Sequence, residues 1–178
     1  MTHLRPLHNE HSSYREKLVE HLFIGEVLRY LWCQGVTCVE SLKPEVDNGG
    51  YDLVIACGRI IRHVQLKSSF VGSTTARQKI HLRLAEKSSG CVVWIEFDPQ
   101  TLAFQSFLWF GDQPGRPLPD ISTRPVAKHA KANMQRIKAV RPNLRVLPRS
   151  AFEKVHGIAA LIDRLFGTLT SDVGQAPP

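Results

Sequence analysis

The chain has 178 residues, a length suited to one domain with its own core, and its 43% hydrophobic and 22% charged residues exclude wholesale disorder and fibrous architectures. The formal net charge of +7 indicates an anionic partner, either nucleic acid or an acidic membrane surface. Residues 1–17 hold no apolar signal-peptide core, and no later segment approaches the ~18 consecutive apolar residues that span a bilayer. We therefore expect a soluble cytoplasmic protein without a membrane partner.

The first predicted element is a long helix that begins at Ser13 and ends at Gly35. Ser13 and Glu16 have the spacing of a capping box, in which each side chain bonds the backbone N–H of the other residue. Apolar residues point in nearly every direction around this helix, so we expect other elements to cover most of it. Glu20 and Glu26 are unusual in such a helix. Either they lie on the part of the helix surface that stays exposed, or they point inward and have a chemical role.

The middle of the chain has the alternating, β-branched and aromatic composition of strands. A glycine, Gly58, suits a tight turn between two of them, and Asp98-Pro99-Gln100 suits a turn between two others. Residues 79–87 fit either a strand edge or a short helix. The predicted strands are 36–40, 51–57, 59–69, 91–97 and 102–110.

The C-terminal part is predicted to add a loop, a strand and a helix. Four prolines in residues 111–125 indicate a surface loop, and residues 144–147 have the composition of a strand. A second capping box, Ser150 with Glu153, predicts a last helix that ends at Gly167. Together the elements predict an α/β fold, a mixed β-sheet flanked by helices, in a single domain over residues 12–170 with flexible ends at 1–11 and 171–178.

The four cysteines do not have the paired spacing of a zinc site. They lie among tryptophan, valine and alanine residues, which favours buried, reduced thiols in a cytosolic protein. The four are Cys33, Cys38, Cys57 and Cys91.

Asp52 and the segment Gln65-Leu66-Lys67 form the strongest candidate site in the sequence. Because side chains alternate along a strand, Gln65 and Lys67 share one face while Leu66 faces the core. Folding at Gly58 is expected to bring Asp52 toward both of them across the ladder. An acid, an amide and a lysine on one face can hold a divalent cation through oxygen atoms and leave an ammonium group to stabilise a developing charge.

The order of these residues resembles the PD-(D/E)XK nuclease superfamily, in particular its Mrr-type restriction endonucleases and archaeal Holliday-junction resolvases. That superfamily has a helix followed by a mixed sheet, with an Asp on one strand and Glu/Asp-x-Lys on the next, often Gln-x-Lys in the Mrr-type branch. This chain has a Glu-bearing helix, Gly35, a short strand, then Gly50-Tyr51-Asp52-Leu53-Val54-Ile55 and Val64-Gln65-Leu66-Lys67-Ser68. The resemblance covers residues 13–69, with Tyr51 in place of the motif's proline, and implies a restriction-endonuclease-like core.

The resemblance also implies an activity, a metal-dependent nuclease acting on DNA, with Mg²⁺ or Mn²⁺ as cofactor and a homodimer as an assembly common in relatives. In relatives the helix acid lies several turns before the glycine that ends the helix, which favours Glu20 over Glu26, and Asp47 is a further candidate. The metal ligands implied are Asp52, Gln65 and Glu20. Carried over by position, the catalytic residues are Asp52, Gln65, Lys67 and the helix acid, Glu20 or Glu26.

Structural roles are the alternative for the same residues. Asp52 would then only begin a strand, Gln65 would be solvated on an exposed sheet face, and Lys67 would be an edge lysine that discourages aggregation. His63 on the same face fits a structural histidine better than a ligand. The alternative functions are a catalytically inactive nucleic-acid-binding module and a protein-interaction component whose basic face meets an acidic partner.

The positive charge of the chain is concentrated in one segment. Between Ile121 and Phe152 there are eight Lys and Arg residues and no Asp or Glu, whereas the remainder nets −1. Such a segment suits contacts with phosphates, and the alternative is a solvated basic face. We expect it to bind nucleic acid beside the Asp52 and Lys67 face and not within it. The predicted binding residues are Lys128, Lys131, Arg136, Lys138 and Arg141.

Overall fold

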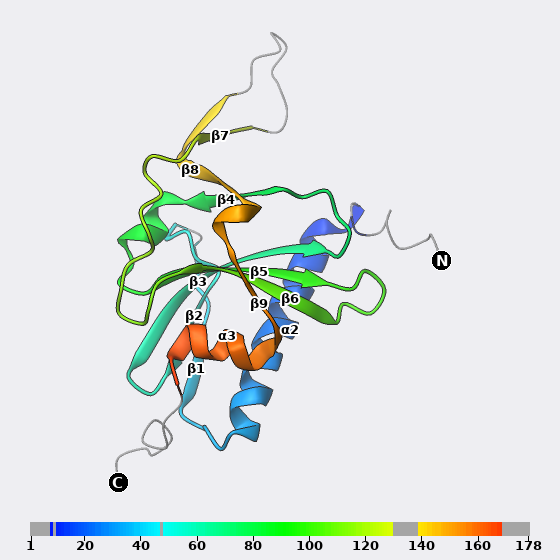
Figure 1. The fold of residues 1–178 in the computed structure, drawn as a ribbon, viewed down its shortest axis with the longest axis vertical. Helices are drawn as coiled ribbons and strands as arrows, with labels where there is room; N and C mark the ends of the chain where they lie inside the picture. Colours follow the sequence, from blue (N-terminus) through cyan, green and yellow to red (C-terminus); the bar gives the residue numbers. More distant parts are fainter. Residues whose placement is uncertain (1–7, 9, 47, 130–138, 169–178) are drawn as a thin grey trace.

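The computed structural model describes residues 8, 10–46, 48–129 and 139–168. Among these residues, six strands form one sheet, called sheet A, in the order β1-β2-β3-β5-β6-β9, and three form a second, called sheet B, in the order β4-β8-β7 (Figure 1). Sheet A comprises β1 (Val39–Leu42), β2 (Leu53–Cys57), β3 (Ile60–Phe70), β5 (Gly90–Phe97), β6 (Phe104–Gly111) and β9 (Glu153–Val155). Sheet B comprises β4 (Arg77–His81), β7 (Val126–Lys128) and β8 (Val140–Pro148).

Two α-helices and two 3₁₀ helices within the described part complete the fold: α2 (Ser12–Cys33), α3 (Gly157–Phe166), η1 (Leu82–Glu86) and η2 (Arg149–Ala151). The mixed α/β class predicted from the sequence is confirmed. None of the helices in the described part is both long enough and apolar enough to cross a bilayer.

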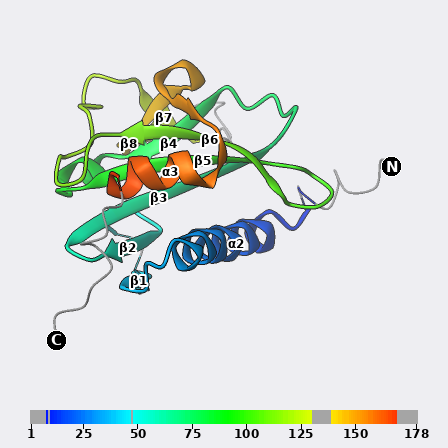
Figure 2. The ribbon, with the colours of Figure 1, turned by 60° about the horizontal axis from the view of Figure 1, so that its bottom comes forward.

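Sheet A lies between α2 on one side and sheet B on the other (Figure 2). Alternation along β5 sends neighbouring side chains into different cores: Val93 packs with α2 and α3, whereas Val92 and Trp94 pack with sheet B. We call these the helix-side core and the sheet-side core. Because both faces of β5 are covered, all of its residues are buried.

The hairpin of β2 and β3 forms as the sequence predicts. Its strands are antiparallel, with Leu53 opposite Val64, and Gly58 turns the chain at a φ of +58°, a value that favours glycine. The second predicted hairpin is also confirmed, since β5 and β6 pair antiparallel. The β3 strand pairs in parallel with β5, so the chain must cross over between them.

That crossover explains the ambiguity of residues 79–87. The segment is both a strand and a helix, because β4 ends at His81 and η1 begins at Leu82. The junction is capped by His81, whose Nδ1 accepts a hydrogen bond of 3.2 Å from the backbone N–H of Arg83. Ile80 and Leu84 anchor both pieces in the sheet-side core.

The long helix is confirmed, but its predicted cap and its predicted coverage are wrong. The N-cap residue is His11, which makes no side-chain cap bond, and Ser13 lies inside the first turn. Only one face of α2 is covered, and Tyr14 is 73% and Trp32 is 72% exposed. The strand expected at 36–40 begins instead at Val39, and the backbone N–H of Val36 still bonds the carbonyl oxygen of Leu31 in the helix.

The last helix begins later than predicted. The predicted capping box, Ser150 with Glu153, does not start a helix: residues 149–151 are a 3₁₀ turn and Glu153–Val155 pairs with β6 as an edge strand. Phe152 and Val155 are three residues apart, as on one face of a helix, but Phe152 packs into the sheet-side core and Val155 into the helix-side core. The helix itself starts at Gly157, where φ is +78°.

The cysteines are all free thiols, as expected, but not all are buried. Cys57 and Cys91 are buried, whereas Cys33 is exposed at the end of α2 and Cys38 is partly covered. Burial, opposed only by the charge of Arg62, raises the pKa of Cys91 to about 12, so this thiol is unreactive at neutral pH.

One residue of the N-terminal segment expected to be loose is packed. His8 is buried, its Nε2 lies 2.8 Å from the carbonyl oxygen of Pro99, and its ring stacks on Phe70. The tail at 171–178 lies outside the described residues.

A buried arginine joins α3 to sheet A. Arg62 on β3 is completely buried, and its guanidinium donates to the carbonyl oxygens of Leu165, Arg164 and Asp112 at 2.6, 2.8 and 2.8 Å. Two of these carbonyls belong to the last turn of α3, whose partial negative charge favours a cation. Burial nevertheless lowers the pKa of Arg62, opposed by Cys91 and Asp112.

Replacing Arg62 by alanine leaves these carbonyl groups without their donor, and each unsatisfied buried group costs ~1–3 kcal/mol. We expect Arg62→Ala to lower the free energy of unfolding by about 3 kcal/mol, as measured by urea denaturation. Arg59→Ala is the matched control, because Arg59 is exposed at the hairpin turn and should change the value by less than ~0.5 kcal/mol. Equal losses in the two variants would show that Arg62 does not attach α3 to the sheet.

Candidate active site

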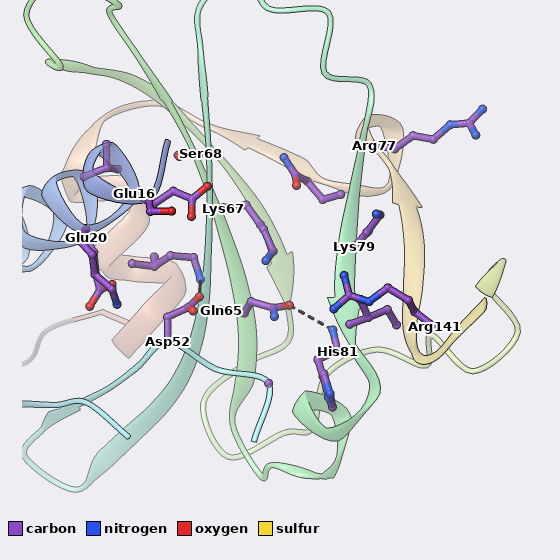
Figure 3. Close-up of a pocket in the computed structure, with 17 residues that line it drawn as sticks. Glu16, Glu20, Asp52, Gln65, Lys67, Ser68, Arg77, Lys79, His81 and Arg141 are labelled. Atoms are coloured by element: carbon purple, nitrogen blue, oxygen red, sulfur yellow. Dashed lines mark hydrogen bonds and ion pairs between the residues drawn. The ribbon is translucent and has the colours of Figure 1, made fainter. Parts of the chain in front are cut away.

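A cleft of about 760 Å³ opens between α2, the start of the β2–β3 hairpin and sheet B (Figure 3). Helix α2 contributes one wall, and β4 with β8 contributes the opposite wall. The floor comes from Asp52 and the middle of β3. The charged residues that line it are Glu16, Lys17, Glu20, Asp52, Lys67, Arg77, Lys79 and Arg141.

Asp52 is held against β3 at the entrance of the hairpin. Its backbone N–H donates to the carbonyl oxygen of Val64 at 2.9 Å, and its Oδ2 accepts a hydrogen bond of 2.6 Å from the N–H of Leu66. The register, with Leu53 opposite Val64, places Asp52 beside Gln65. The hairpin therefore brings Asp52, Gln65 and Lys67 to one cleft, as its alternation and turn predicted.

Gln65 is buried and joins the two sheets. It is 7% exposed, and its Oε1 accepts a hydrogen bond of 3.3 Å from the backbone N–H of His81 on β4. The alternative interpretation of Gln65 as a solvated residue is therefore wrong. This hydrogen bond attaches β4 to β3 beside the floor of the cleft. It is one of the contacts that determine the position of sheet B relative to sheet A.

Lys67 projects from β3 into the cleft (Figure 3). The β3 strand lies inside sheet A, between β2 and β5, so Lys67 is not an edge lysine. The Lys67 side chain is partly exposed and lines the cleft together with Gln65 of the same strand face.

Of the two predicted helix acids, Glu20 lines the cleft, and Glu16 of the same helix lines it as well. Glu20 is 6% exposed, and its carboxylate lies between two lysines, with Oε1 2.6 Å from Lys43 Nζ and Oε2 3.0 Å from Lys17 Nζ. The contact with Lys43 is the shorter of the two ion pairs and involves a buried oxygen atom. Burial by itself would raise the pKa of Glu20, but the ammonium groups of Lys43 and Lys17 outweigh it and hold the pKa below its ordinary value.

Glu26 does not reach the cleft. It follows Glu20 by six residues on α2, and at ~100° per residue this turns it ~120° around the helix axis. Its carboxylate pairs with Arg29 at 2.6 Å on the outer surface. The structure thus separates the two candidate acids and leaves Glu20 beside Asp52.

His63 has a structural position. It lies edge-on to the ring of Tyr51, with the ring centroids 4.9 Å apart, and it is not among the residues that line the cleft. Burial and then the charge of Lys87 lower the pKa of His63, so it is neutral near pH 7. This agrees with the interpretation of His63 as a structural histidine.

The wall of sheet B carries cations that the sequence prediction missed. Arg77 and Lys79 on β4 line the cleft with His81, and their every-second spacing in a short polar segment was the available signal. Arg141 also lines the cleft. The prediction that the basic segment lies beside the site and not within it is therefore wrong for Arg141.

The other basic residues have different positions. Lys128 is exposed on β7, and its carbonyl oxygen accepts a hydrogen bond of 3.3 Å from Lys79 Nζ. Arg149 is used structurally, in an ion pair of 2.7 Å with Glu96. Three predicted nucleic-acid contacts and one candidate acid lie outside the described residues: Lys131, Arg136, Lys138 and Asp47.

The oxygen donors of the cleft fit the chemistry of Mg²⁺, which takes one or two carboxylates and completes its coordination with waters and phosphate oxygens. Asp52 and Glu20 supply carboxylates, and Gln65 supplies a carbonyl oxygen. In the part of the chain that is described, no three or more His, Cys, Asp and Glu side chains are grouped to hold a metal ion. Asp52, Glu20 and Gln65 are thus the predicted ligands whose oxygen atoms line the cleft, and Glu16 is a third carboxylate there.

In comparisons with known proteins, no protein-family model and no curated protein matches the chain.

The lysine pair around Glu20 sets its response to pH. Because the folded-state pKa lies below the ordinary value of 4.5, Glu20 stabilises the fold above that value, and this contribution is lost as the pH falls through the folded-state pKa. Lys43→Met removes one of the two ammonium groups that counteract the effect of burial on Glu20. We therefore expect the pKa of Glu20 to rise. The part of the unfolding free energy that is lost at acidic pH should become smaller.

The measurement is the ¹³C shift of the Glu20 carboxyl carbon against pH. Lys128→Met, at an exposed position on β7, is the control and should leave the titration unchanged. An unaltered Glu20 titration in Lys43→Met would show that the ion pair does not hold the carboxylate in its charged form.

Proposed function

We propose that this protein is a metal-dependent nuclease that hydrolyses phosphodiester bonds of DNA. The observation that carries the proposal is the convergence of Asp52, Gln65 and Lys67 with Glu20 in one cleft. Glu20 comes from α2, Asp52 directly precedes β2, and Gln65 and Lys67 come from β3. This order along the chain is the one on which the resemblance to PD-(D/E)XK nucleases depends. We propose on the same ground that α2 with sheet A is a restriction-endonuclease-like core.

Each residue has a role that follows from its position. The N–H of Leu66 bonds Oδ2 of Asp52 at 2.6 Å and so fixes the direction of the carboxylate. Lys67 stabilises negative charge on the phosphoryl oxygens, since a preorganised cation in a partly enclosed cleft acts more strongly than in water. Gln65 keeps β4 in place and offers its carboxamide to the same cleft.

A divalent cation held by Asp52 and Glu20 would polarise the phosphate and lower the pKa of the attacking water. For Glu20 to contribute, Lys43 and Lys17 must give up part of their contact with its carboxylate. This exchange becomes favourable when the phosphate of the substrate attracts the two ammonium groups.

One observation favours a second function, a catalytically inactive nucleic-acid-binding module. Two lysines already neutralise Glu20, and the N–H of His81 already uses Oε1 of Gln65. In that case the cleft retains the basic wall for binding but does not hold a metal ion. Salt-dependent DNA binding without cleavage in Mg²⁺ or Mn²⁺ would identify this function.

The nuclease proposal is tested with purified protein, Mg²⁺ or Mn²⁺, and labelled single-stranded, duplex and branched DNA, with RNA in parallel. We expect cleavage that EDTA abolishes. Asp52→Asn and Lys67→Met should each reduce the rate at least ~100-fold, the loss typical when one charge-stabilising group is removed. Cleavage that survives both substitutions would refute this assignment of the site.

The two helix acids provide a matched pair of variants. Glu20→Gln removes a carboxylate from the cleft, whereas Glu26→Gln makes the same change on the outer surface of the same helix. We expect the first to lower the cleavage rate and to raise the Mg²⁺ concentration that gives half the maximal rate. The second should leave both quantities unchanged, and the reverse result would exchange the roles of the two acids.

A further inference from the structure

Sheet B gives the cleft a wall that carries only positive charge. Arg77 and Lys79 come from β4, and Arg141 comes from β8. The strands β4, β7 and β8 contain no Asp or Glu. The carboxylates of the cleft, Glu16, Glu20 and Asp52, all come from the other side.

The orientation of this wall is set by packing. Ile80 between Lys79 and His81 is completely buried in the sheet-side core, so alternation directs its two neighbours the other way. The bond from Gln65 Oε1 to the N–H of His81 then holds β4 beside the floor. The cations that line the cleft therefore belong to strands and not to a loop.

The three cations are directed differently. The Arg141 side chain extends from β8 toward Gln65 and Lys67, whereas the Arg77 side chain points away from them (Figure 3). The Lys79 ammonium group donates to the carbonyl oxygen of Lys128 at 3.3 Å. Three positive groups on one wall can each contact a phosphate of a single strand.

The size and chemistry of the cleft restrict the ligand further. About 760 Å³ lies within the ~300–1,000 Å³ of small-ligand sites, which is room for a short piece of one strand and not for a duplex. The described residues that line it include no Phe, Tyr or Trp. It therefore lacks the aromatic platforms on which single-strand binders usually stack bases.

We propose that the wall of sheet B binds the phosphate backbone of a single strand of nucleic acid through Arg77, Lys79 and Arg141, without stacking or reading its bases. The inference rests on the proposed nuclease function and names its substrate class. It predicts binding that is indifferent to sequence and strongly dependent on salt, because nearly all of the affinity comes from phosphate contacts.

The test measures binding separately from cleavage. Fluorescence anisotropy in EDTA follows labelled single-stranded DNA of two unrelated sequences, the same strand as a duplex, and the RNA equivalent. The triple variant R77Q/K79Q/R141Q is compared with R59Q/R116Q/K154Q, which removes the same charges from exposed positions outside the cleft. Single R141Q, at the residue whose side chain points toward Gln65 and Lys67 (Figure 3), reports the same effect where the triple variant does not fold. Circular dichroism establishes folding.

Each phosphate contact to a single strand contributes ~0.7 to the slope of log K against log salt. We expect the cleft triple variant to lose about 2 from this slope and the control to lose far less. Single strands should bind better than the duplex, both sequences should bind alike, and RNA should bind like DNA. Equal slopes in the two triple variants, or stronger binding of the duplex, would overturn the inference.

The two proposals can fail separately. Single-strand binding that depends on these cations, in a protein that cleaves nothing with Mg²⁺ or Mn²⁺, would leave the inference standing and remove the nuclease. Metal-dependent cleavage with an unchanged KM in R77Q/K79Q/R141Q would do the opposite.

Discussion

The position of β3 in the middle of sheet A is the constraint on which the rest of the structure depends. The strand pairs antiparallel with β2 on one side and parallel with β5 on the other, and one of its faces packs in the helix-side core while the other lines the cleft. Its alternation therefore directs Arg62 and Val64 into the helix side, where they hold α2 and α3, and directs Gln65 and Lys67 to the side of sheet B. One face of β3 thus packs against the helices and stabilises the fold, and the other face supplies residues of the cleft.

The cleft is an electrostatically divided space. Carboxylates come from α2 and the β2 entrance, and the cations of the opposite wall come from sheet B. In a partly enclosed site of this kind, charges interact more strongly than at an open surface. The two lysines beside Glu20 balance the charge of its buried carboxylate.

The elements that the sequence predicted well are those governed by local alternation and turns. The β2–β3 hairpin, its turn at Gly58 and the antiparallel β5–β6 pair followed from such signals. The last helix did not, because Phe152 and Val155 imitate a helical spacing while they serve two different cores. A local pattern cannot show which of two cores a side chain will enter, and that decision depends on distant strands.

The sequence alone determined the mixed α/β class and the shared face of Gln65 and Lys67 with Asp52 across the ladder, since a period of two and a glycine turn are local properties. Only the tertiary structure decided that Glu20 and not Glu26 faces Asp52, because this depends on which side of α2 packs against the sheet. It also brought Arg77, Lys79 and Arg141 into the same cleft. These cations belong to a second sheet, and its position depends on the burial of Ile80 and on the bond between Gln65 and His81.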